Sequence, residues 1–306
     1  MGSIAYLGPA GTFTEAALLQ MIAAGLVPRH AGECQPLPVD STPAALDAVR
    51  DRVSDFACVP IENSIDGSVT PTLDGLASGP PVQVFAELTL DVAFNIVVAP
   101  GRTAADVRTV AAFPVAAAQV RRWLAAHLPR AELRPAISNA EAAQQVADGH
   151  VDAAVSSPLA GTQRGLAALA EGVVDEANAR TRFVLVGRPG PPPARTGADR
   201  TSVVLRIDNA PSALVTALAE FGMRGIDLTR IESRPTRIEL GTYVFFLDCV
   251  GHIDDDAVAE ALKALHRRCT DVRYLGSWPT GEIAGSPPPQ LDDATRWLSD
   301  LREGSA

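Results

Sequence analysis

The stretch that most constrains this chain covers residues 56–72. It begins with a short apolar segment, residues 56–61, of the kind that forms a buried strand of a parallel sheet. The segment ends in Glu62, Asn63 and Ser64. Because ligands of open α/β sheets bind beyond the carboxyl ends of the strands, this pattern predicts an α/β fold with a site at that end. A solvated Glu62 and a simple helix cap at Asn63 or Ser64 fit the spacing equally well.

A proline-rich segment, residues 188–199, divides the chain. Prolines at this density favour an extended spacer over a strand or helix. At 306 residues the chain is also too long for one ordinary core. We therefore expect a first domain over residues 1–187, a linker over 188–199, a second domain over 200–279 and a tail over 280–306.

Strand and helix patterns alternate in the first domain, which favours parallel sheets. The expected strands are 4–7, 56–61, 92–98, 109–113, 133–137, 151–155 and 183–186. The expected helices are 15–24 with Thr14 as N-cap, 41–50, 114–128, 138–149 and 158–165. These elements form two lobes, about 1–80 plus 170–187 and 81–169, with the last strand rejoining the first lobe.

The order of elements after the linker is β-α-β-β-α-β, which is typical of the ferredoxin-like fold. The expected strands are 201–207, 226–232, 242–250 and 272–277, with helices at 213–221 and 257–266. A short terminal helix is expected at 292–302.

Composition narrows the class of function. A net charge of −10 argues against nucleic acid or an anionic membrane as a partner. The sequence shows no signal peptide and no apolar run of about 18 residues, so we expect a cytoplasmic protein. The four cysteines and five histidines are scattered without ligand spacing, so we expect neither a metal site nor disulfides.

Several motifs in order resemble those of the prephenate dehydratases. They are GPAGTFT at 8–14, VPIENSIDGSV at 59–69 and TRF at 181–183. In the second domain, residues 208–214 and the ESRP sequence at 232–235 look like an ACT domain, a module that binds amino acids. The resemblance covers about 275 residues. It implies a two-lobed catalytic domain like the periplasmic binding proteins, with its site in the cleft, followed by a ferredoxin-like ACT domain.

The resemblance implies conversion of prephenate to phenylpyruvate, water and carbon dioxide on the way to phenylalanine, with phenylalanine as effector. It implies no cofactor, because aromatisation of the ring drives the reaction. It also implies a homodimer or homotetramer formed through the ACT domain. Two alternatives stay open: an arogenate dehydratase, and a non-catalytic two-lobed sensor of a small anion.

The catalytic residues that the resemblance implies are Thr181, Glu62 and Gln119. Thr181 would donate a hydrogen bond to the leaving hydroxyl, and Glu62 would supply the proton if burial raises its pKa. The substrate-binding residues that we expect are Asn63, Ser64, Arg182, Phe183, Thr12 and Ser156. Plain alternatives are a surface ion pair for Arg182, a helix-surface position for Gln119 and a capping role for Ser156.

The chain departs from the family at two places. Relatives commonly read Ser-His-Pro-Gln where this chain has Ala112, Phe113, Pro114 and Val115, so a hydroxyl often assigned to the site is missing. Its role would pass to Ser64, Ser156 or water, or lapse.

The second departure lies in the ACT domain, where Ser212 replaces a usual glycine. A side chain there costs about 1 kcal/mol if φ is positive. The effector-binding residues that we expect are Ala210, Pro211, Ser212, Ala213, Leu214, Glu232, Ser233, Arg234 and Pro235. A plain hairpin edge would also explain the last four.

Overall fold

The computed structural model describes residues 2–28, 34–176, 179–281, 285–289 and 292–304. The chain divides into two compact units. The first unit comprises residues 1–72 and 88–185, and the second comprises residues 73–87 and 186–306. None of the helices in these described ranges is long and apolar enough to cross a membrane.

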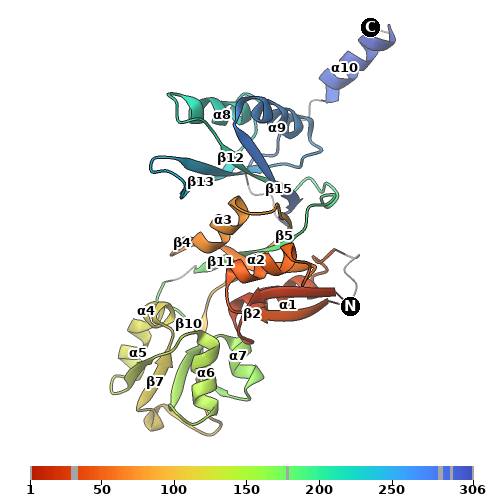
Figure 1. Ribbon diagram of the computed structural model, residues 1–306. Coiled ribbons are helices and arrows are strands. Elements are labelled where there is room, and N and C mark those ends of the chain that lie inside the picture. The colour runs from red at the N-terminus through yellow and green to blue at the C-terminus, as the bar shows by residue number, and fades with distance from the viewer. Residues whose placement is uncertain (1, 29–33, 177–178, 282–284, 290–291, 305–306) are drawn as a thin grey trace. The chain divides into compact units, whose positions relative to one another are not determined.

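The first sheet has the strand order β2-β1-β3-β11-β5, and β4 pairs with β3. Figure 1 labels β2, β4, β5 and β11 among its strands. Its strands are β1 (Gly2–Leu7), β2 (Cys34–Val39), β3 (Phe56–Asn63), β4 (Gly67–Ser68), β5 (Gln83–Asp91) and β11 (Arg180–Gly187). Both β2 and β3 run parallel to β1. With helices α1 (Phe13–Ala23) and α2 (Thr42–Arg50), this sheet forms the first lobe.

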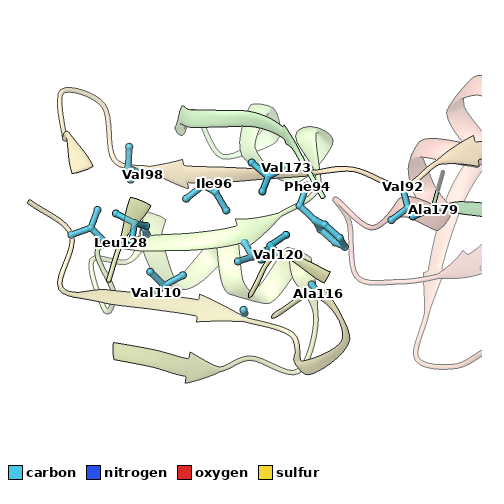
Figure 2. Packing of buried hydrophobic residues seen from close by; sticks show 14 residues of the cluster. Val92, Phe94, Ile96, Val98, Val110, Ala116, Val120, Leu128, Val173 and Ala179 are labelled. Carbon is cyan, nitrogen blue, oxygen red and sulfur yellow. The ribbon is translucent and has the colours of Figure 1, made fainter. Parts of the chain in front are cut away.

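The second lobe is built on a sheet with the order β10-β6-β9-β7-β8. Its strands are β6 (Phe94–Val98), β7 (Thr109–Ala112), β8 (Glu132–Pro135), β9 (Ala153–Ser156) and β10 (Ala167–Val173). Its helices are η2 (Ala104–Asp106), α4 (Pro114–Gln119), α5 (Arg121–His127), α6 (Asn139–Ala147) and α7 (Pro158–Gln163). Figure 2 shows its core, in which Phe94, Ile96 and Val110 from the strands meet Ala116 and Val120 from the helix side.

The expected two-lobed α/β arrangement is confirmed, and β11 rejoins the first sheet between β3 and β5 as predicted. Two strands change the predicted division of the lobes. β5 belongs to the first sheet, although residues 81–169 were assigned to the second lobe. β10 was not predicted at all, and it pairs with β6 through two register shifts.

Two helices of the first domain also differ from expectation, one in its N-cap and the other in its continuity. Thr12 caps α1, accepting a hydrogen bond from Glu15 N, in place of Thr14. The single helix predicted over 114–128 is two helices broken at Val120, which has non-helical backbone angles and is fully buried. The Asp175 carboxylate caps the second helix by accepting from the N–H groups of Arg122 and Trp123. This cap comes from more than 50 residues away, so no local pattern could predict it.

The second unit contains a four-stranded antiparallel sheet with the order β13-β14-β12-β15, which confirms the ferredoxin-like prediction. The strands are β12 (Asp199–Arg206), β13 (Leu228–Pro235), β14 (Tyr243–Val250) and β15 (Asp271–Pro279). Helices α8 (Ala213–Gly222) and α9 (Asp256–Arg268) pack on one face through Val203, Leu205 and Leu247. A last helix, α10, spans Asp292–Glu303.

The other face of this sheet contacts residues 73–87, which include the end of α3 (Thr70–Ala77). The Arg273 guanidinium donates to the carbonyl groups of Leu76, Ser78 and Gly79. A Cβ added at Gly276 would lie 2.4 Å from the Val84 carbonyl oxygen, so the backbones of these two segments are in close contact. Residues 73–87 are therefore part of the C-terminal unit, which the sequence did not predict.

Candidate active site

The end of β3 lies beside the start of β11, and this pairing brings two of the predicted motifs together. The Asn63 amide donates to the Thr181 hydroxyl over 2.8 Å. The Asn63 amide oxygen accepts from the backbone N–H groups of Ile65 and Asp66. Since a backbone N–H can only donate, these two bonds determine which atom of the amide is the oxygen. Thr181 therefore accepts from Asn63 and keeps its own hydrogen for another acceptor.

Glu62 and Arg182 form an ion pair at 3.2 Å next to this hydrogen bond. The Arg182 side chain is 11% exposed, whereas the Glu62 side chain is 42% exposed. The burial that a proton-donating Glu62 requires is therefore not observed. Ser64 ties the same strand ends together, because its N–H donates to the Arg180 carbonyl and its hydroxyl accepts from the Arg180 N–H.

Gln119 closes α4 and is 9% exposed. Its side-chain oxygen has no hydrogen-bond partner among the described residues. A buried polar atom of this kind costs free energy unless a ligand or water satisfies it. The alternative of a helix-surface position is excluded, and Gln119 remains a candidate for contact with substrate.

A cleft of about 840 Å³ opens between the two lobes. The first lobe lines it with the loop after β1, the first turn of α1 and residues 38–40, and the second lobe lines it with Phe113 and residues 137–139. The described residues that line this cleft do not include Glu62, Thr181 or Gln119. The loop after β1 lines the cleft, and β3 ends in Glu62 and Asn63, which contact Arg182 and Thr181. Because β1 pairs with β3, the cleft and this group of four residues are built on neighbouring strands of one sheet.

Three predicted substrate-binding residues have structural roles. Phe183 is 2% exposed and belongs to the core, so its predicted contact with substrate is not supported. Ser156 is fully buried and donates to the Asn139 carbonyl, so it cannot replace the hydroxyl missing at Ala112. Thr12 lines the cleft, but its hydroxyl already donates to the Leu7 carbonyl.

Some residues at the cleft were not singled out from the sequence. Asp40 follows β2, and Ser138 and Asn139 begin α6. The position of Ser138 in the capping pattern of residues 138–141 was visible in the sequence, and its hydroxyl does accept from Glu141 N. Nothing in the sequence indicated that this helix start faces the cleft.

The described residues contain no group of three or more His, Cys, Asp or Glu that could hold a metal ion. Two cysteines are deeply buried. Burial raises the pKa of both thiols, that of Cys249 to about 12. These thiols therefore stay protonated near neutral pH and are poor nucleophiles.

The two expected effector motifs lie at one end of the C-terminal sheet. Arg234 in β13 is opposite Val244 in β14, which in turn is opposite Arg206 at the end of β12. The loop containing residues 210–212 follows β12. Ser212 has φ 67°, so serine occupies a left-handed position that favours glycine.

The Arg234 side chain is already engaged. It binds both Asp74 carboxylate oxygens at 3.1 to 3.3 Å, and Arg237 binds the same carboxylate at 2.5 Å. Asp74 belongs to α3, on the sheet face opposite α8 and α9. Arg234 therefore anchors residues 73–87, and its predicted role in binding the effector is not supported by this contact.

Comparisons with known proteins agree with these observations. The family model for prephenate dehydratase matches residues 4–191, and the model for the ACT domain matches residues 201–267. The chain belongs to the prephenate dehydratase family. The expected family and the ACT domain are thus both confirmed.

Relatives and solved structures match this chain over most of its length. A prephenate dehydratase of Mycobacterium bovis (strain BCG / Pasteur 1173P2) is 77% identical over 305 residues, covering 99% of this chain and 95% of the relative. The crystal structure of a prephenate dehydratase from Arthrobacter aurescens in complex with L-Phe is 38% identical, with a TM-score of 0.86 and coverage of 98% and 99%. GqqA, described as a novel type of quorum quenching acylase, is 28% identical, with a TM-score of 0.77 and coverage of 90% and 97%.

Proposed function

We propose that this chain converts prephenate to phenylpyruvate, with loss of the C1 carboxylate as carbon dioxide and of the C4 hydroxyl as water. The departing hydroxyl takes up one proton, and the ring becomes aromatic. The observation that supports this most directly is the Asn63–Thr181 hydrogen bond. It directs the Thr181 hydrogen away from Asn63, as a donor to a leaving hydroxyl requires.

In this proposal Thr181 donates to the C4 oxygen as its bond to carbon lengthens. A positioned donor of this kind contributes a factor of about 10² to 10⁴ in rate. We place the departing hydroxyl at Thr181 rather than at Thr12, because the Thr12 hydroxyl already donates to the Leu7 carbonyl. Arg182, kept in place by Glu62, offers positive charge for a substrate carboxylate beside the same strand ends. Gln119 completes the set with a buried oxygen that can accept from a substrate hydroxyl.

Regulation belongs to the second domain. We propose that phenylalanine binds at the loop of residues 210–214 and at Glu232 and Ser233, because the two ACT motifs meet at this end of the sheet. The Arthrobacter relative was solved in complex with L-Phe, which supports phenylalanine as the effector. β13 is an edge strand whose Ile231 is 51% exposed, and such edges pair readily with a second copy. A homodimer or homotetramer formed through the ACT domain is therefore part of the proposal, as is a cytoplasmic site of action in amino-acid biosynthesis.

One experiment tests the catalytic proposal. Purified protein is offered prephenate, and phenylpyruvate is followed with and without phenylalanine. The Thr181→Ala variant should lose a factor of about 10² or more in kcat with little change in KM, because the lost contact strengthens only in the transition state. Thr181→Ser, which keeps the hydroxyl, should retain much of the activity. A folded Thr181→Ala variant with the wild-type kcat would contradict the role of Thr181, and no turnover of prephenate by the wild type would contradict the function.

A second candidate is arogenate, which has an amine where prephenate has a keto group. Asp40 favours it, because this carboxylate lines the cleft and could pair with an ammonium group. Offering arogenate in a parallel assay and measuring phenylalanine decides between the two substrates. A higher kcat/KM for arogenate than for prephenate would assign the chain to that substrate.

A further inference from the structure

The loop between β1 and α1 is held between the two lobes by a set of contacts that the proposed reaction does not use. Gly11 in this loop has φ 92°, and an added Cβ would lie 2.8 Å from the Cβ of Ala160 in α7. The loop belongs to the first lobe and α7 to the second. The backbone of one lobe therefore packs directly on a helix of the other, and only glycine fits this contact.

Hydrogen bonds cross the same contact. The Ser157 hydroxyl, fully buried at the start of α7, donates to the Gly11 carbonyl. The Glu15 carboxylate, from the first turn of α1, accepts from Gly11 N at 2.5 Å and from the Gln163 amide at 3.1 Å. Glu15 is 8% exposed, so its charge is satisfied mainly by these donors and by the neighbouring Tyr6 hydroxyl.

The adjoining residue strengthens the connection. Phe13 packs against the second-lobe core and meets Phe94 edge to face, with ring centroids 5.6 Å apart. The first turn of α1 therefore contacts the second lobe at two points, through Phe13 on Phe94 and through Glu15 on Gln163. The same loop forms one wall of the interlobe cleft through Gly8, Pro9, Ala10 and Thr12, on both sides of Gly11.

We propose that Gly11, Glu15, Ser157 and Gln163 form an interlobe clasp that sets the position of this cleft wall, and that Gln163 is a positioning residue for substrate binding. The inference rests on the proposed function, because it requires that prephenate binds in this cleft. The clasp hydrogen bonds named above do not involve Thr181, so we expect the clasp to act on substrate and transition state alike. Loss of such uniform binding raises KM and leaves kcat unchanged.

A swap of the two side chains tests the clasp. Gln163→Glu places two carboxylates within hydrogen-bond distance and should raise KM for prephenate by about tenfold, with kcat within about twofold of wild type. The reciprocal double variant, Glu15→Gln with Gln163→Glu, restores one amide and one carboxylate. It should return KM to within about twofold of the wild-type value.

The matched control is Gln145→Glu. Gln145 donates to Glu141 within α6 at 2.5 Å, so the same charge repulsion arises inside one lobe, and KM should not change. An unchanged KM in Gln163→Glu, or a double variant no better than the single one, would overturn the proposal. An equal rise of KM in Gln145→Glu would also overturn it, because the effect would then not require the lobe contact.

Thermal unfolding of the same four proteins gives a readout independent of activity. The clasp predicts that Gln163→Glu lowers the Tm and that the swap restores it. If the wild type does not turn over prephenate but the Tm values follow this cycle, the proposed function fails and the interlobe contact stands. If turnover is normal but neither KM nor Tm follows the cycle, the clasp fails alone.

Discussion

At the scale of single residues, Asn63 uses both polar atoms of its side chain within the chain. Its oxygen closes the turn into Ile65 and Asp66, and its amide group donates to Thr181. Asn63 and Thr181 could be predicted as site residues from the sequence, because both lie in motifs of the family. It could not show that the turn after β3 orients the amide, and that orientation is what leaves Thr181 able to donate.

Replacement of Asn63 by aspartate tests this orientation. The turn survives, because a carboxylate oxygen can still accept from the Ile65 and Asp66 N–H groups. The second oxygen can only accept, so it attracts the Thr181 hydrogen away from the substrate. We expect kcat of Asn63→Asp to fall by about 10². Steady-state kinetics at neutral pH measure it, with circular dichroism as a check on folding. A variant as fast as the wild type would show that the Thr181 hydrogen does not depend on Asn63.

Ser212 gives a second test at this scale. The sequence indicated a cost for serine only on the condition of a positive φ, and the structure shows 67°. Its side chain also makes no capping hydrogen bond to α8. Ser212→Gly should therefore stabilise the protein by about 1 kcal/mol. We also expect tighter phenylalanine binding, because the backbone can then approach the ligand.

Unfolding in urea and calorimetric titration with phenylalanine measure the two effects. For the unfolding measurement alone, Ser233→Gly is the matched control, since Ser233 lies within β13, where glycine weakens a strand. A destabilised Ser212→Gly variant would mean that the serine hydroxyl has a role that outweighs the backbone strain.

At the scale of elements, local patterns predicted most helices and strands but missed β2, β5, α3 and β10 and the break at Val120. Two of these failures, the break and β10, have a common cause. Ser41, Ser138 and Ser157 cap their helices as the sequence indicates. The break at Val120 depends on Asp175, and β10 depends on a partner strand far away in the chain. Elements determined by their own residues could be predicted, whereas those determined by a distant side chain or strand could not.

Asp152, just before β9, connects its own segment to the start of β7, which lies more than 40 residues earlier in the chain. Its carboxylate accepts from Arg108 N, Thr109 N and the Thr109 hydroxyl at 2.9 to 3.0 Å. These hydrogen bonds, that from Arg108 N foremost, lower the pKa of Asp152. A lowered pKa in the folded state stabilises the protein above the unfolded value of about 3.9, and this contribution is lost as the pH falls through the folded pKa.

Asp152→Asn removes the charge at every pH. Its Tm should therefore lie below the wild-type Tm at pH 7, and the difference should shrink as the pH is lowered below about 4. Melting curves between pH 3 and pH 7 measure this difference. A gap of constant size across that range would assign the effect of the substitution to shape rather than to charge.

At the scale of the whole molecule, the proline-rich linker alone does not describe how the chain divides, because residues 73–87 belong to the C-terminal unit. Residues 73–87 lie within the first domain in sequence but pack with the C-terminal sheet. They are held there by Arg273 on three carbonyl groups, by Arg234 and Arg237 on Asp74, and by Arg200 and Trp278 on Glu87. No sequence pattern indicated this pairing, since each of these contacts spans more than 100 residues.

Removal of residues 200–306 tests this organisation. The truncated chain keeps residues 73–87 without the sheet that they contact, and leaves the Asp74 and Glu87 carboxylates without their arginine partners. We expect a lower Tm and a large loss of prephenate turnover, measured on the purified fragment. Arg273→Ala is the milder companion and should lower the Tm without abolishing activity. A fragment as stable and active as the full chain would show that residues 73–87 fold without the sheet.

The placement of residues 73–87 also bears on how such an enzyme could be recombined. A chimaera joined within residues 188–199 would receive a foreign effector module while keeping the native segment that covers one face of the sheet. The foreign module would then pack against a helix, α3, that its own sequence did not evolve with. Asp74 of the recipient would lose its ion pairs with Arg234 and Arg237. We therefore expect a working exchange between relatives to move residues 73–87 and the C-terminal sheet together, as a matched pair of segments rather than as one block.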